Sequence, residues 1–234
     1  MKNFKGFTLA EVLITLGVIG VVSAMTMPIL IKNIQHKSLE SQFKKSYSQL
    51  SQVIEQARIE DGNFSYSNYG EIRDFIKEKY KKIKIVDNFD TSYLESFKTY
   101  NKSKGGNMIR GNCFEYHKKG YLQFINSDGS FISMCAHDYH GVMISVDTNG
   151  YKGPNSFGHD LFFFVLKNSK LSYLSSINRD CTDNEECPDA GFIWVGAPCS
   201  INSNSSANGL SCLNYALTDT CPDNPNKKYW ECLP

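Results

Sequence analysis

The sequence has no marked excess of charge of either sign. It contains 25 Lys and Arg residues against 24 Asp and Glu residues, which gives a formal net charge of +1. A protein that binds nucleic acid normally carries a concentrated basic face. The Lys-rich stretch at residues 77–84 has the pattern of a solvated surface. Nucleic acid is therefore not expected as a partner.

The common catalytic motifs are also missing. The sequence has no G-x-S-x-G, no H-E-x-x-H and no phosphate-binding glycine loop. His137 and His140 lie between two expected strands, where a pair of histidines usually belongs to the surface. Residue types alone leave a Cys–His nucleophile open, but every Cys has a simpler role in a disulfide. We therefore predict no catalytic residues and no enzymatic activity.

The first 112 residues contain no cysteine, and all eight lie between Cys113 and Cys232. An even number confined to one part is typical of disulfides formed in an oxidising compartment. Residues 178–234 hold six of them and few apolar runs, so disulfides are expected to stabilise this region. A zinc site is the alternative, although the spacings lack a short C-x2-C. From proximity alone, the expected pairs are Cys113–Cys135, Cys181–Cys187, Cys199–Cys212 and Cys221–Cys232.

Charge is nearly absent from the apolar stretch at residues 7–31. This stretch of about 25 residues is long enough, as a helix, to cross a hydrocarbon core about 30 Å thick. Its one charge is Glu11, and a carboxylate near the end of a membrane helix usually has a partner or a role. Gly17 and Gly20 allow close approach of another helix. Pro28 predicts a kink or a locally unwound turn.

The residues Gly6-Phe7-Thr8-Leu9-Ala10-Glu11 match the pattern G-F-T-L-x-E, and an apolar helix follows them. In this the sequence resembles the type IV prepilin family, which includes the pseudopilins of type II secretion. The resemblance implies that a prepilin peptidase cleaves after Gly6 and methylates the new terminal Phe7. It also implies that the helix packs against copies of itself in a filament core, where Glu11 neutralises the amino terminus of a neighbouring subunit.

Two other interpretations of the N-terminus fit the sequence less well. A secretory signal peptide would end in a small-x-small site after a shorter apolar region, and Ser23-Ala24-Met25 is a poor match. An uncleaved membrane anchor explains the length and the hydrophobicity but not Gly6-Phe7 or Glu11. The motif therefore favours a prepilin-like protein.

The pattern beyond the apolar stretch predicts an α+β fold. Apolar residues continue at spacings of three and four as far as Ala57, and Gly62 supplies a helix stop. A short helix is expected near residues 72–80, within a connecting region at 63–110. Four strands are expected at 121–125, 131–135, 142–146 and 161–166, with a hairpin turn at 127–130. These strands should form an antiparallel meander with one face on the amphipathic helix, as in a pilin head.

The expected organisation follows from these elements. It comprises a leader peptide (1–6), a transmembrane or filament-core half of the helix (7–31), an amphipathic half (32–61), a pilin-like β-sheet head (62–177) and a Cys-rich C-terminal region (178–234).

A loop from Asp147 to Asp160 separates the last two expected strands. Asp147 and Asn149 place oxygen ligands at alternate positions before a glycine, as a calcium loop requires, and Asp160 could close the site. The pattern D-x-N-G-x-K-G-P-N resembles the calcium-carrying loop of major pseudopilins. Turn formation alone is the simpler alternative, because Asp and Asn side chains bond their own backbone. No cofactor is expected to be required, and calcium is the single candidate.

The resemblance implies a structural subunit of a type IV pilus or of a type II secretion pseudopilus. The implied partners are the prepilin peptidase, other pilin or pseudopilin subunits, an inner-membrane assembly platform, and membrane lipid before assembly. The head would lie outside the cytoplasm on a single-pass anchor in the inner (cytoplasmic) membrane, and later in a periplasmic or cell-surface filament. Alternatives are an adhesin-type minor pilin whose Cys-rich tail recognises a surface, an exported substrate or DNA, and an anchored domain that never polymerises.

Overall fold

The computed structural model describes most of the chain. The described residues are 6–61, 69–79, 84–85, 93, 95–102, 122–137, 141–167, 170–173 and 197–234. The chain divides into two compact units between Ser38 and Leu39. The second unit is called the head below.

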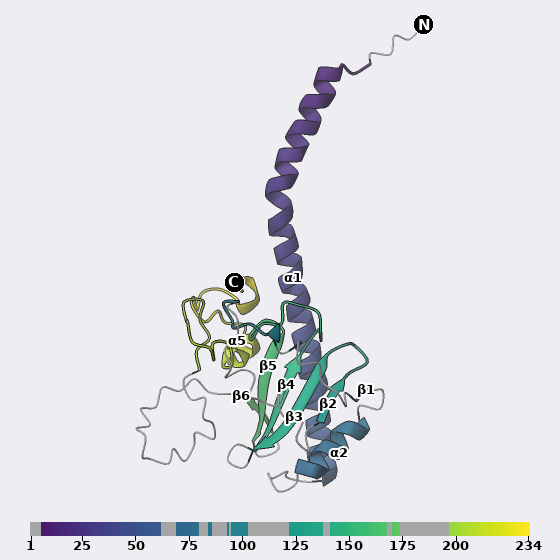
Figure 1. The fold of residues 1–234 in the computed structure, drawn as a ribbon, viewed down its shortest axis with the longest axis vertical. Coiled ribbons are helices and arrows are strands. Elements are labelled where there is room, and N and C mark those ends of the chain that lie inside the picture. Colours follow the sequence, from purple (N-terminus) through teal and green to yellow (C-terminus); the bar gives the residue numbers. More distant parts are fainter. Residues whose placement is uncertain are drawn as a thin grey trace. The chain divides into compact units, whose positions relative to one another are not determined.

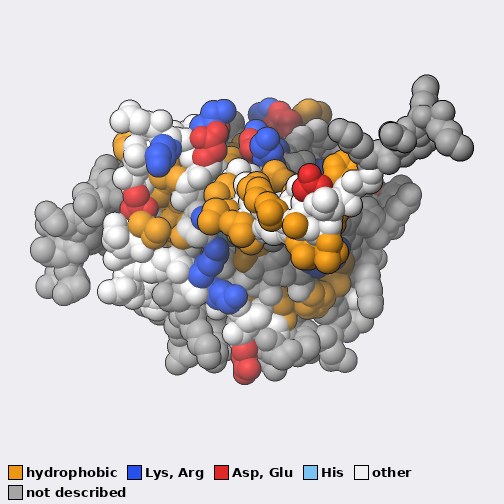
Figure 2. Space-filling view, turned by 90° about the horizontal axis from the view of Figure 1, so that it is seen from above, with side chains coloured by type: hydrophobic (Ala, Val, Ile, Leu, Met, Phe, Trp, Pro, Cys, Tyr) orange, Lys and Arg blue, Asp and Glu red, His pale blue; other side chains and the backbone are white. Residues whose placement is uncertain are grey.

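The first unit consists mainly of the N-terminal part of helix α1, which spans Leu9–Asp61 without a break (Figure 1). Its large apolar side chains are exposed, from Leu13 at 61% to Ile34 at 59%. Hydrophobic side chains are visible at the surface in the space-filling view (Figure 2). By length and composition this is the one described helix that could cross a membrane. An apolar surface of this extent is typical of a segment that contacts lipid or another protein.

The helix continues through Pro28. Of the two outcomes expected there, a locally unwound turn is therefore not observed. Proline has no backbone N–H, so the carbonyl of Ala24 cannot accept the usual helical hydrogen bond from residue 28. The end of α1 at Asp61 agrees with the stop expected at Gly62.

The head is built on a six-stranded antiparallel sheet whose strands lie in sequence order (Figure 1). The strands are β1 (Lys84–Ile85), β2 (Leu122–Ile125), β3 (Phe131–His137), β4 (Gly141–Asp147), β5 (Leu161–Lys167) and β6 (Lys170–Tyr173). The tight turn between β2 and β3 is closed by hydrogen bonds from Asn126 N to Ser130 O (2.8 Å) and from Gly129 N to Asn126 O (2.9 Å). The meander and its hairpin turn are as predicted.

One face of the sheet packs against the second half of α1 and against helix α2 (Tyr69–Lys79). Side chains that alternate along β5, such as Phe162 and Phe164, face Phe43 and Tyr47 of α1, with ring centroids 4.5 and 6.0 Å apart. The period of two along a strand places every second residue on this face. This is the pilin-like packing expected from the sequence.

The opposite face of the sheet is also buried, which the sequence did not predict. Phe163 and Val165 of β5 pack there with Phe97 and Leu210, so strand β5 is covered on both sides. The residues that cover this face come from segment 95–102, expected only as a connection, and from Ala197, Ala207 and Leu210. Burial on two faces explains why β5 reads as a continuous apolar run rather than as an alternating one.

The C-terminal residues are part of this core. Helix α5 (Cys212–Thr218) and the 3-10 helix η2 (Tyr229–Glu231) bring Leu213 and Trp230 into the cluster around α1. Disulfides join Cys199 to Cys212 and Cys221 to Cys232, two of the four pairs expected. Cys135 is also disulfide-bonded. The other expected partners, Cys113, Cys181 and Cys187, lie outside the described residues, as does His140.

Candidate functional site

The expected cleavage point lies in exposed, non-helical backbone. Residues 6–8 precede the first helical residue, Leu9, and the side chain of Phe7 is 89% exposed. Exposed backbone outside a helix is where proteolytic cleavage concentrates. The bond between Gly6 and Phe7 is therefore accessible to an enzyme before α1 begins.

Glu11 forms a capping box with Thr8. The backbone N and the Oγ1 of Thr8 each donate to Glu11 Oε2 over 2.8 Å, and Glu11 N donates to Thr8 Oγ1 over 3.3 Å. This reciprocal arrangement satisfies backbone donors that a helix start leaves without partners. Among the described residues, the second carboxylate oxygen, Oε1, accepts no hydrogen bond. Glu11 can thus cap its own helix and still bind a second positive group.

Thr8 was not identified as a functional residue from the sequence. Its signal was present as the spacing T-x-x-E, which is the pattern of a capping box. The same residues also belong to the processing motif, which hides the capping role in the sequence.

The loop between β4 and β5 begins and ends on two fully buried carboxyl groups, Asp147 and Asp160. The hydroxyl of Tyr93 donates to Asp147 Oδ2, and Asn149 N donates to Asp147 Oδ1 over 3.1 Å. Asp160 Oδ2 accepts from Asn155 N (2.8 Å) and Asp160 Oδ1 from Ser156 N (2.7 Å). Each carboxyl group therefore holds a bend of the loop through its hydrogen bonds.

Burial is the largest cause of the raised pKa values at this site. It raises the pKa of Asp147 well above its ordinary value, and the nearby charge of Asp160 raises the pKa further, while the Tyr93 hydroxyl and backbone N–H groups oppose the rise. Burial likewise raises the pKa of Asp160 to about 6, against hydrogen bonds from Ser156 and Asn155. The pKa of Tyr93 is raised by burial and by Asp147, so its hydroxyl remains a donor. Two buried carboxyl groups this close call for a proton or a cation between them.

The oxygen atoms around the pair are of the type that calcium binds. Thr148 Oγ1, Asn149 Oδ1 and Asn155 Oδ1 are buried and have no hydrogen-bond partner in the described part of the chain. Hard cations such as calcium take carboxylate, amide and hydroxyl oxygens. No group of three or more His, Cys, Asp or Glu residues suited to a metal is found within the described ranges. The donor set fits calcium in kind, and without calcium the hydrogen bonds described above together with a proton on the pair satisfy the carboxyl groups.

The same loop joins distant parts of the head. Lys98 N donates to Asn155 O and Phe157 N donates to Lys98 O, both over 2.9 Å. The Tyr229 hydroxyl donates to Gly158 O, and His159 Nε2 lies 2.8 Å from Tyr100 O. The segment at 95–102 and the C-terminal region thus both attach to residues 155–159. The sequence predicted roles for Asp147 and Asp160 at the two ends of this loop, but not the contacts of residues 155–159 with the rest of the head.

Comparison with known proteins adds one match. The family model described as the prokaryotic N-terminal methylation motif matches residues 1–27. No curated protein and no solved structure matches the chain. The matched residues include the exposed Gly6–Phe7 bond and the capping box of Glu11. The chain therefore carries the N-terminal methylation signature that type IV pilins and pseudopilins share, on a pilin-like α+β fold with a long helix, an antiparallel sheet and C-terminal disulfides.

Proposed function

We propose that the protein is a structural subunit of a type IV pilus or of a type II secretion pseudopilus. The observation that supports this is the exposed apolar part of α1, which begins directly after the processing motif. In this proposal the helix first anchors the subunit in the cytoplasmic membrane, with the head outside the cytoplasm. A prepilin peptidase cleaves after Gly6 and methylates Phe7, and an assembly platform then transfers the subunit to the filament.

Glu11 has the role of a register group in this proposal. Cleavage after Gly6 creates an amino group on Phe7, and a buried ammonium needs a counter-charge. A neighbouring subunit can supply Glu11 Oε1 without giving up the capping box, because the Thr8 contacts use only Oε2. An apolar helix gains little by leaving lipid for another apolar helix, so this polar pair would fix the axial position of each subunit.

The processing step is tested by the mass of the N-terminal peptide of the native protein. Membranes and the sheared surface fraction should be analysed separately. We expect a peptide that starts at methylated Phe7; in the sheared fraction it would indicate a surface filament, and in membranes alone a short pseudopilus. An intact Met1 terminus in both fractions would contradict the proposal and leave an anchored domain that does not polymerise.

We also propose that Asp147, Asn149 and Asp160 are ligands of a calcium ion. Calcium would supply the positive charge that the buried carboxyl pair otherwise obtains from a proton. At pH 7.5, the full-length protein in detergent should melt several degrees lower in a chelator than with calcium. The Asp147→Asn variant, which keeps the size of the side chain, should lose this calcium response. An unchanged melting temperature on chelation of the unsubstituted protein would favour turn formation alone.

In chelator, the stability of the folded protein should fall as the pH rises, which is the opposite of the usual effect of paired carboxylates. Because the pKa of each carboxyl group is higher in the folded state, the folded chain binds more protons, and stability falls as the pH rises from about 4 through about 6. The shift of Asp160 alone corresponds to about 3 kcal/mol. Other groups titrate here too, so the measurement is the difference in melting temperature between the parent and Asp147→Asn at pH 4.5 and 7.5. A difference that stays constant with pH would contradict the raised pKa values.

A further inference from the structure

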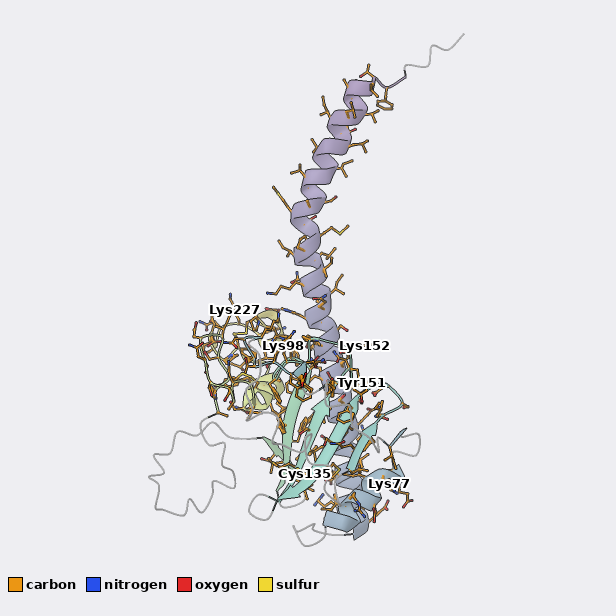
Figure 3. All side chains as sticks on the ribbon, in the orientation of Figure 1. Lys77, Lys98, Cys135, Tyr151, Lys152 and Lys227 are labelled. Carbon is orange, nitrogen blue, oxygen red and sulfur yellow. A yellow bond between two sulfur atoms is a disulfide. The ribbon has the colours of Figure 1, made fainter. Side chains whose placement is uncertain are left out.

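Three exposed lysines lie at one end of the head (Figure 3). They are Lys98, Lys152 and Lys227, and they are called the lysine face. In the described part of the chain none of them forms an ion pair. In the view from above, Lys and Arg side chains are visible at the surface together with Asp and Glu side chains (Figure 2).

The lysine face is assembled from three segments that are distant in sequence. Lys98 is fixed to the β4–β5 loop by its backbone hydrogen bonds to Asn155 and Phe157, and Lys152 belongs to that loop. Lys227 lies two residues before Tyr229, whose hydroxyl donates to Gly158 of the same loop. The rigid core around the loop therefore holds all three lysines on one end of the head.

Some acidic groups at this end of the head are buried or paired, whereas Glu95, Asp223 and Glu231 are exposed. Asp147 and Asp160 are inside the loop, Asp128 pairs with Lys45 over 3.0 Å, and Asp223 accepts from the Ser200 hydroxyl. Glu231 is exposed, and exposed Lys228 lies close to it in sequence. The three lysines are therefore cations without an ion pair in the described part of the chain, and exposed carboxylates lie at the same end.

This end is also the one at which α1 enters the head. Near the start of the head, the Phe43 ring lies 4.5 Å from Phe162, at the beginning of β5, and 5.3 Å from Trp230. The opposite end carries helix α2, which is joined to the far part of α1 by the ion pair between Lys79 and Glu60 (3.1 Å).

Chain length limits how far this end can be from a membrane. Leu39 follows Ile31, the last residue of the apolar stretch, by eight residues. Eight residues span at most about 29 Å when fully extended and about 12 Å as a helix. Whatever the angle between the two units, the start of the head stays near the surface of a membrane that contains the apolar stretch. The tether also gives a high effective concentration of head at that surface.

We propose that the lysine face binds anionic lipid headgroups while the subunit is anchored in the membrane. This rests on the proposed membrane insertion but not on cleavage or filament assembly. Each Lys near an anionic surface contributes about 1 kcal/mol, and the attraction extends about one Debye length, roughly 8 Å at physiological salt. Tyr151, which is 48% exposed beside Lys152, places an aromatic ring of the kind found at membrane interfaces at the same end. Nucleic acid would meet the same charges, but lipid is held beside them by the tether.

The test measures amine labelling of the full-length protein in vesicles by mass spectrometry. Neutral phosphatidylcholine vesicles are compared with vesicles that also contain anionic phosphatidylglycerol. We expect Lys98, Lys152 and Lys227 to react several-fold more slowly in the anionic vesicles, with normal rates restored at high salt. Lys77, which is exposed on α2 at the other end of the head, is the control and should react equally in both.

Variants show whether protection from labelling depends on the charge of the lysine face or only on the closeness of the head to the membrane. In Lys98→Gln/Lys152→Gln/Lys227→Gln, protection of neighbouring Lys228 in anionic vesicles should disappear, whereas Lys77→Gln should leave it unchanged. Equal labelling of the lysine face in both vesicle types would overturn the proposal, as would protection that persists in neutral vesicles or at high salt. Such a result together with methylated Phe7 in cells would reject the lipid contact and leave the filament function standing.

Discussion

Replacing Glu11 by Ala should leave cleavage after Gly6 intact and lower incorporation into filaments about a hundredfold. Removal of one partner of a buried ion pair costs about 3–5 kcal/mol, because the other charge remains buried without compensation. In the proposed filament, the remaining charge would be the amino group of Phe7 in a neighbouring subunit. The measurement compares the amount of subunit in sheared filaments with the amount in membranes, and the N-terminal peptide mass verifies cleavage.

The control for this variant is Thr8→Val. Glu11→Ala also removes the capping box, whose loss at a helix start costs about 1 kcal/mol. Thr8→Val removes the hydroxyl contacts but keeps the carboxylate and the backbone N–H that donates to it. It should therefore reduce incorporation far less than Glu11→Ala. Equal defects in the two variants would assign the effect to helix capping, and normal incorporation of Glu11→Ala would rule out the pairing role.

Replacing Gly158 by Ala should destabilise the head by about 3 kcal/mol. Gly158 has a φ of +79°, and a Cβ there would lie 2.8 Å from Cys212 Cβ, Cys212 Sγ and Tyr229 Oη. Cys212 and Tyr229 are fully buried, so neither can move aside without disturbing the core. The backbone conformation and the overlap each contribute about 1–3 kcal/mol. For a domain of this size, the loss should lower the melting temperature by about 6–12 °C.

The matched control is Gly70→Ala on helix α2. Gly70 is exposed and helical, and an added Cβ there would meet no atom within 4 Å. The change should raise stability by up to about 1 kcal/mol, since Ala is a better helix former than Gly. Circular dichroism of the full-length proteins with disulfides intact measures both. A melting temperature for Gly158→Ala equal to that of the parent would show that the loop does not hold the C-terminal region as described.

Features encoded by neighbouring residues were predictable from the sequence. The helix from the apolar stretch to Asp61 and the β2–β3 turn depend on spacings of a few residues. The disulfides at Cys199–Cys212 and Cys221–Cys232 have sequence separations of 13 and 11, which is why proximity sufficed as a guide. The meander also followed, because consecutive strands usually pair.

Contacts between distant segments were not predictable in the same way. Tyr93 reaches Asp147 across 54 positions, and nothing in the local pattern around Tyr93 marks it as a partner of a loop carboxyl. The second buried face of the sheet depends on Phe97 and Leu210, which come from segments with little periodicity. The loop between Asp147 and Asp160 presents a different limit, because the same residue types make a turn and bind calcium.

Pro28 has a mechanical consequence for a filament built from this helix. An α-helix rises 1.5 Å per residue and an extended chain about 3.3–3.6 Å, so each residue that unwinds lengthens the chain by about 2 Å. The turn between Ala24 and Pro28 lacks one backbone hydrogen bond, and opening it therefore breaks fewer bonds than opening a turn elsewhere in the apolar half. Under tension, we expect the apolar half of each helix to extend first at this turn.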